Sequence, residues 1–147
     1  MPEALREKLY ALKEAVDINS DRIMQEAITE MLRTGFYPAH LDRIRAVYRE
    51  RRDAMLTALR EWMPPDVTWT EPEGGFFVWL RLPVGMDVAD ALALGNERGV
   101  GIVPGTGCTA APGGQRDGMR LGFCAQPPPA ITEAVRRLAG VISELRP

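Results

Sequence analysis

The sequence predicts an α/β fold of the α+β kind, a two-layer sandwich in which helices cover a small, mostly antiparallel or mixed sheet, preceded by two or three helices. Three observations predict it. Residues 1–62 repeat apolar side chains at helical spacing, residues 67–123 contain four short strand-like runs, and a last helical stripe follows Pro127. Because strands this short are not stable separately, we expect all four to share one sheet.

A helical segment is expected over residues 1–38, before a domain over residues 39–147. Its two helices are joined by a turn at 17–20, and the second is capped by Ser20 or Asp21 and stopped by the 35–38 stretch. The stripes are Leu5, Leu9, Leu12 and Val16, then Ile23, Ala27, Ile28, Met31 and Leu32. We expect Leu5, Leu9, Ile23, Ile28 and Met31 to form an exposed apolar surface, which favours self-association.

The domain is expected to begin with one long amphipathic helix from His40 to Trp62. The stripe of this helix is Leu41, Ile44, Tyr48, Met55, Leu59 and Trp62. The strands are expected at 67–70, 76–82, 100–103 and 119–123. The second strand places apolar and aromatic residues on both of its faces, which predicts cover on both sides.

Helices and loops are expected between and after these strands. A helix from Met86 to about Arg98 has Asp87 as its N-cap, and the Gly- and Pro-rich stretch up to Gly118 is a loop. A final helix follows the prolines at 127–129. Its core-facing stripe is Ile131, Val135, Leu138, Ile142 and Leu145.

Composition excludes several classes of function. A formal net charge of −2 gives no electrostatic footprint for nucleic acid or an anionic membrane. No apolar run approaches the roughly 20 residues of a membrane-spanning helix, and the charged start is not secretory, so a cytoplasmic location is expected. Cys108, Cys124 and His40 lack metal-ligand spacing, so no metal site is expected.

Arg120 is the residue whose setting suggests a ligand. It lies between Met119 and Leu121 in an apolar strand, where a guanidinium needs a partner for its charge. A substrate carboxylate suits its bidentate N–H groups. The alternatives are an internal salt bridge or a solvent-facing position. Gly74 and Gly75 likewise fit either a turn or a close approach of backbone to a ligand.

Four motifs follow one another in a family-like order: YRERRDAM at 48–55, EGGFFVWLRLP at 73–83, GVGIVPG at 99–105 and MRLGF at 119–123. In this order and spacing they resemble the C-terminal domain of fold-type-I, class I and II, pyridoxal-phosphate-dependent aminotransferases. The similarity is greatest to the branch of 2-aminoadipate and kynurenine aminotransferases. It covers nearly the whole chain, and residues 1–41 resemble the two helices that follow the family's cofactor lysine.

The resemblance implies roles for three residues. Arg120 corresponds to the arginine that binds the α-carboxylate of the amino acid. Pro104 and Gly105 begin the loop on the substrate side. Most relatives carry an aromatic residue a few positions after this loop begins, where this chain has residues 106–108, Thr-Gly-Cys. The resemblance therefore leaves the specificity for the substrate side chain open.

The resemblance also implies what the chain lacks. Pyridoxal phosphate is the cofactor of the parent enzyme, but its lysine and aspartate belong to the large domain. Lys8 and Lys13 are the only lysines, and neither has the family's serine-rich context. No cofactor is therefore expected on this chain, and no catalytic residue is assigned. The start of the chain, where the lysine loop would end, suggests a truncation, a proteolytic product or a split gene.

The function predicted from the resemblance is transfer of an amino group from an amino acid to a 2-oxo acid in amino acid metabolism. The isolated chain, as a fragment of such a transferase, is expected to be inactive. Its expected partners are the amino acid and 2-oxo acid substrates, a missing large domain or second subunit, and further copies of itself. The alternative is a non-catalytic, stand-alone α/β module that binds a carboxylate ligand or a protein.

Overall fold

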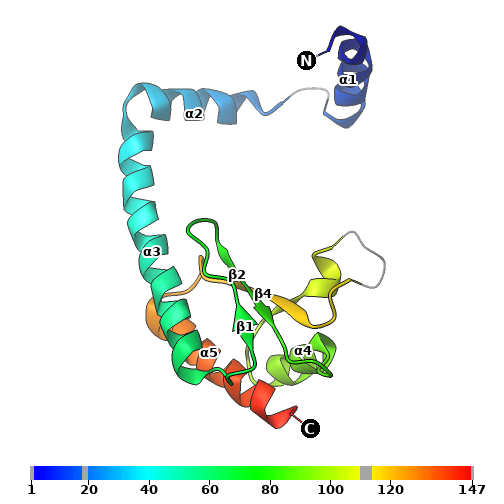
Figure 1. Cartoon of the computed structure of the whole chain (residues 1–147). Helices are drawn as coiled ribbons and strands as arrows, with labels where there is room; N and C mark the ends of the chain where they lie inside the picture. The colour runs from blue at the N-terminus through cyan, green and yellow to red at the C-terminus, as the bar shows by residue number, and fades with distance from the viewer. Residues whose placement is uncertain (1, 18–19, 110–113, 147) are drawn as a thin grey trace. The chain divides into compact units, whose positions relative to one another are not determined.

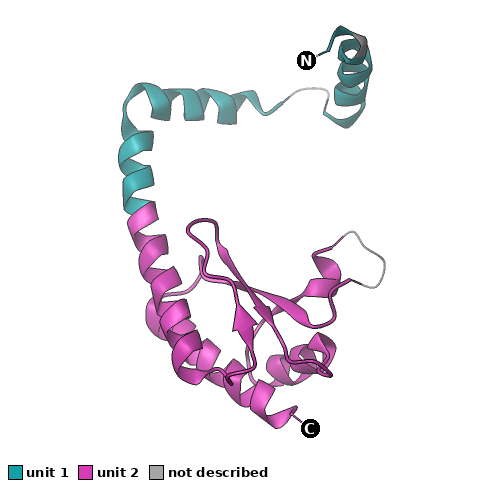
Figure 2. Ribbon diagram, viewed as in Figure 1, with its two compact units in different colours: residues 1–44 teal, residues 45–147 magenta. Residues whose placement is uncertain are grey.

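The computed structural model describes residues 2–17, 20–109 and 114–146 (Figure 1). The chain divides into two compact units, residues 1–44 and residues 45–147, which are described separately below (Figure 2). The predicted turn at 17–20 and the predicted loop before Gly118 fall partly outside the described residues. No helix in the described ranges is both long enough and apolar enough to cross a membrane.

The first unit consists of α1 (Glu3–Val16), α2 (Arg22–Arg33) and the beginning of α3 (Phe36–Trp62). Asp21, one of the two predicted caps, starts α2, and its Oδ1 accepts a hydrogen bond from the Met24 N–H at 3.1 Å. The predicted start of α3 at His40 is wrong by four residues. Pro38 lies in the first turn of α3, where the N–H that proline lacks would have no partner within the helix.

The apolar stripes of α1 and α2 are largely exposed, as predicted. Leu5 and Leu9 on α1 are 49% and 45% exposed, and Ile23 and Ile28 on α2 are 84% and 46% exposed. Met31 is half-buried. The apolar stripes of α1 and α2 are therefore not buried by the described residues.

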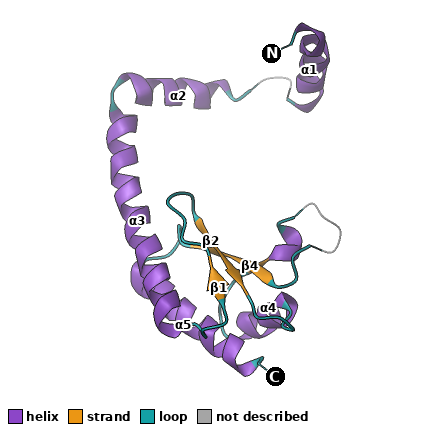
Figure 3. Ribbon diagram, in the orientation of Figure 1, coloured by secondary structure: helices purple, strands orange, loops and turns teal. Residues whose placement is uncertain are grey.

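The second unit contains the sheet and the remaining helices (Figure 3). After the last turns of α3 come β1 (Thr68–Trp69), β2 (Phe77–Arg81), α4 (Val88–Glu97), β3 (Val103–Pro104), the 3₁₀ turn η1 (Gly105–Gly107), β4 (Gly118–Gly122) and α5 (Pro128–Glu144). The strands form one sheet in the order β1-β2-β4-β3, and each neighbouring pair is antiparallel. The prediction of a single sheet and of the β-β-α-β-β-α order is confirmed.

The third strand begins later than predicted. Val100, the expected start of β3, donates its N–H to the Gly95 carbonyl at 2.8 Å, which closes the end of α4 instead of extending the sheet. Pairing begins only at Val103, which lies opposite Arg120. The other strands differ from the prediction by one residue at each end.

The core lies on one face of the sheet. Val78 and Leu80 of β2 are fully buried, as are Leu59 of α3, Val88 of α4 and Leu138 of α5. Met119 and Leu121 of β4 join the same cluster. All three helices of this unit therefore contribute to the core on the same side of the sheet.

The opposite face of the sheet is open, so the predicted cover on both faces of β2 is wrong for the described residues. Phe77 points away from the core and is 43% exposed, and Trp79 is half-buried. At the end of α3, Trp62 is also not part of the core, since it is 44% exposed. The helices of this unit therefore leave this face of the sheet uncovered among the described residues.

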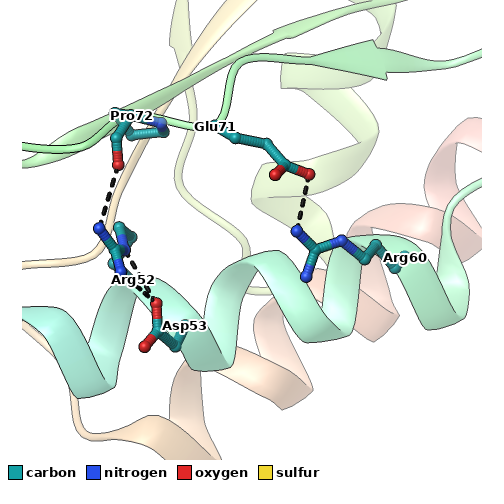
Figure 4. A network of polar contacts seen from close by, with 5 residues as sticks. All are labelled: Arg52, Asp53, Arg60, Glu71 and Pro72. Carbon is teal, nitrogen blue, oxygen red and sulfur yellow. Dashed lines mark hydrogen bonds and ion pairs between the residues drawn. The ribbon is translucent and has the colours of Figure 1, made fainter.

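Two arginines of α3 hold the connection between β1 and β2 (Figure 4). Arg52 Nη1 donates to the Pro72 carbonyl at 3.3 Å, and Arg60 Nη2 lies 2.7 Å from Glu71 Oε1. Gly75 then has a φ of +83°, a conformation that residues with a side chain rarely adopt. The predicted glycine turn is therefore present, and it delivers the chain to Phe77 at the start of β2.

Asp87 caps α4, as predicted. Its Oδ1 accepts a hydrogen bond from the Ala89 N–H at 2.9 Å, and its Oδ2 accepts one from Arg116 Nε at 2.8 Å. The Ala89 N–H and then the Arg116 guanidinium lower the pKa of Asp87 below its ordinary value. The carboxylate thus joins the start of α4 to the segment that leads into β4.

Candidate carboxylate-binding site

Arg120 lies at the centre of the open face. It is the middle residue of β4 and is paired with Trp79 of β2 on one side and Val103 of β3 on the other. The residue is half-buried, and its Nε is a buried nitrogen with no hydrogen-bond partner among the described residues. A buried N–H without an acceptor destabilises the fold, unless a ligand or another group accepts its hydrogen bond.

Among the described residues, the Arg120 guanidinium contacts an aromatic ring and no acid. The Arg120 Cζ lies 4.2 Å from the centroid of the Phe77 ring, within the range of a cation–π contact. Within the described ranges, no carboxylate lies at salt-bridge distance from this guanidinium. The N–H groups of Arg120 therefore have no acidic partner among the described residues, and the planar oxygen pair of a carboxylate matches their geometry.

Pro104 and Gly105 lie beside the arginine strand. Pro104 ends β3 opposite Met119, and the buried Gly105 begins η1. A Cβ on Gly105 would lie 2.7 Å from the Gly118 carbonyl oxygen, and one on Gly118 would lie 2.6 Å from Cζ2 of Trp79. The absence of side chains at these glycines lets Trp79 pack over the first residue of β4 and keeps the loop start against the sheet.

The two lysines lie outside this unit. Both belong to α1, where Lys13 Nζ is 2.8 Å from Asp17 Oδ2 and 3.0 Å from Ser20 Oγ, while Lys8 is exposed. Residues 45–147 contain no lysine at all. The second unit therefore offers no lysine amine that could bind an aldehyde cofactor covalently, and its residues do not fit an attachment site for pyridoxal phosphate.

Metal-binding and thiol chemistry have little support in the described residues. No group of three or more His, Cys, Asp or Glu side chains gathers there in a way that could hold a metal ion. Cys108 is exposed after η1. Cys124 is half-buried, and its carbonyl accepts a hydrogen bond from Arg51 Nη1.

The sequence singles out Arg120 as a candidate but not its neighbour Phe77. The motif that contains Phe77 was interpreted as a core strand, and no local pattern marks this ring as the one that meets the arginine. The signal lies in the strand register, which places Phe77 opposite Gly122 and Trp79 opposite Arg120. Residues on the same face of neighbouring strands, two positions apart, are close enough for long side chains to touch.

A family profile and individual relatives both match this chain. The profile of the family described as aminotransferase class I and II matches residues 2–138. Aromatic-amino-acid aminotransferase 1 of Thermococcus litoralis is 40% identical over 93% of this chain and 33% of its own length. The 2-aminoadipate transaminase of Thermus thermophilus is 38% identical over 98% of this chain and 36% of its own length.

A solved structure shares the fold of nearly the whole chain. The crystal structure of Pyrococcus horikoshii kynurenine aminotransferase superposes with a TM-score of 0.89 and 36% identity. The match covers 97% of this chain and 35% of that one. The chain thus spans about a third of the length of the relatives it matches.

Proposed function

This chain belongs to the class I and II aminotransferase family, and from that premise we propose that it binds the α-carboxylate of an amino acid or 2-oxo acid through Arg120. The observation that carries the proposal is the buried Arg120 Nε, which has no hydrogen-bond partner among the described residues and lies on the open face of the sheet. Residues 39–147 act as the small domain of the enzyme, and Pro104 and Gly105 begin the loop on the substrate side.

The reaction is transfer of an amino group between an amino acid and a 2-oxo acid in amino acid metabolism. Pyridoxal phosphate supplies the electron sink for this chemistry when it is bound. The part of this chain is to fix the substrate carboxylate, and so to orient the substrate. Because the unit that carries Arg120 has no lysine, the chain requires a large domain for activity and is inactive by itself.

Removal of the Arg120 guanidinium tests the proposed site directly. Titration of the chain with glutarate, followed by calorimetry, should show binding that Arg120→Ala weakens about 10- to 100-fold, because hydrogen bonds to a charged group are lost. Arg120→Lys should recover only part of the affinity, since an ammonium cannot form the bidentate pair.

Glutaramide, which has the shape of glutarate without its charge, serves as the control ligand and should bind neither protein measurably. Equal affinity of the chain and of Arg120→Ala for glutarate would remove the proposed role of this residue.

We also propose that α1 and α2 pack against another polypeptide surface, which is a large domain in a complete enzyme and a second copy when the chain is alone. Support comes from the exposed apolar side chains of these helices, such as Ile23 at 84% and Leu9 at 45%. Contiguous apolar surface of a few hundred Å² commonly marks an interaction site.

Sedimentation equilibrium should therefore show concentration-dependent association of the chain. Ile28→Glu should shift the equilibrium toward monomer, while Gln25→Glu adds the same charge to α2 without removing an apolar side chain and should not. A chain that remains monomeric at high concentration contradicts this proposal.

A further inference from the structure

We propose that Phe77 is a positioning residue for Arg120, which holds the guanidinium in place while leaving its N–H groups free for the carboxylate. The inference rests on the proposed function and goes beyond it by assigning a residue that acts through Arg120. The observation behind it is that the Phe77 ring centroid lies 4.2 Å from Arg120 Cζ, on the open face of the sheet.

The ring of Phe77 is held by its neighbours. Its cross-strand partner is Gly122, and a Cβ placed there would lie 3.6 Å from two ring carbons of Phe77, so the ring lies over this glycine. Phe76 meets Phe77 edge to face at 6.4 Å between centroids, and Tyr48 of α3 meets Phe76 in the same way at 5.2 Å. Edge-to-face pairs at these separations are favourable.

The backbone around Phe77 is also fixed. The Phe76 carbonyl accepts the Phe123 N–H at 3.0 Å, which continues the pairing of β2 with β4 by one residue. Before this point, Arg52 of α3 donates to the Pro72 carbonyl (Figure 4). The segment that leads to Phe77 is thus hydrogen-bonded to α3 through Arg52 and to the end of β4 through Phe123.

An aromatic ring is chemically suited to this task. A carboxylate beside Arg120 would neutralise the charge, but it would occupy the same N–H groups that a substrate carboxylate needs. A ring over Cζ attracts the cation through its π face and accepts none of the in-plane N–H groups as a carboxylate would. Phe77 therefore stabilises the arginine without competing with the ligand.

The test replaces the ring and follows both the arginine and the ligand. In ¹H–¹⁵N spectra of the full chain, the Arg120 Nε–H signal, assigned by its absence in Arg120→Ala, should carry a ring-current shift that Phe77→Leu removes. Phe77→Leu should weaken glutarate binding about 3- to 10-fold, whereas Phe77→Tyr should stay within about twofold of the unsubstituted chain. Trp62→Leu, which removes an exposed ring at the end of α3, is the matched control and should change neither quantity.

The outcomes separate the two proposals. If Arg120→Ala abolishes glutarate binding while Phe77→Leu leaves it unchanged, the positioning role is wrong and the proposed carboxylate site stands. If Arg120→Ala leaves binding unchanged, the proposed site itself fails. Equal weakening by Phe77→Leu and Phe77→Tyr would also overturn the positioning role, since the aromatic ring would then not be what matters. Should Phe77→Leu not fold, Phe77→Trp must alter the Arg120 signal without weakening binding, and weaker binding would overturn the inference.

Discussion

The purified chain, supplied with pyridoxal phosphate, an amino acid and a 2-oxo acid, should form new amino acid at no more than about 10⁻⁴ of the rate of an intact family member, because loss of one positioned acid–base group alone costs about 10² to 10⁴. The unit with Arg120 contains no lysine, and Lys13 on α1 is engaged with Asp17 and Ser20. Nothing in residues 45–147 can therefore serve as the amine that binds the cofactor and moves the substrate proton.

The measurement is product formation over time, with an intact aminotransferase as the positive control. Borohydride reduction followed by mass spectrometry reports whether the cofactor becomes fixed to any lysine, and the double variant Lys8→Gln, Lys13→Gln sets the background. Turnover that depends on Lys8 or Lys13 would show that the chain supplies its own catalytic amine, and the proposed inactivity would be wrong.

Phe123→Ala should lower the free energy of unfolding by about 3–5 kcal/mol, which is a large part of the roughly 5–15 kcal/mol that stabilises a typical domain. Phe123 is 1% exposed and is among the largest fully buried side chains of the unit. Its truncation removes apolar contacts and leaves a cavity in the cluster that joins α3, α5 and the sheet. Its own N–H donates to the Phe76 carbonyl, a backbone bond that Phe123→Ala retains, so the expected loss comes from side-chain packing alone.

Urea denaturation followed by circular dichroism measures this effect. Val84→Ala removes methyl groups from a fully exposed position and should leave the unfolding midpoint unchanged. A loss below about 1 kcal/mol in Phe123→Ala would mean that the site collapses around the truncated side chain and that the core is less tightly packed than its burial indicates.

Local patterns in the sequence were sufficient to predict that each helix exists and to identify Asp87 as a cap, but not where α3 begins. The α5 stripe buries Ile131, Val135, Leu138 and Ile142 as its spacing predicts, and Asp87 caps α4. Predicted bounds are wrong where another hydrogen bond competes with the pattern read from the sequence. The apolar run at 100–102 is typical of a strand, but the Val100 N–H bonds to Gly95, and so the strand begins at Val103.

The candidate site was predictable only in part. An arginine between apolar neighbours in a strand needs a partner for its charge, but this pattern leaves a salt bridge or a solvent-facing position open, and only the family resemblance assigns a carboxylate to Arg120. Its companion Phe77 depends on the register between β2 and β4, which is fixed by pairs of residues far apart in the chain, such as Phe77 with Gly122. The same register determines that Phe77 and Trp79 face outward while Val78 and Leu80 enter the core, a choice that a strand with apolar residues on both faces leaves open.

The confinement of both lysines to α1 also decides where amine-selective reagents attach. Esters that acylate amines label the two lysine side chains and the amino terminus of the polypeptide, and Lys8 is the more open of the two lysines, since Lys13 is already bonded to Asp17 and Ser20. A fluorophore or a sensor surface coupled in this way leaves every side chain of residues 45–147 chemically intact. The guanidinium of Arg120 can thus be probed with ligands on immobilised or dye-labelled protein, with no risk that the coupling itself has modified the binding face.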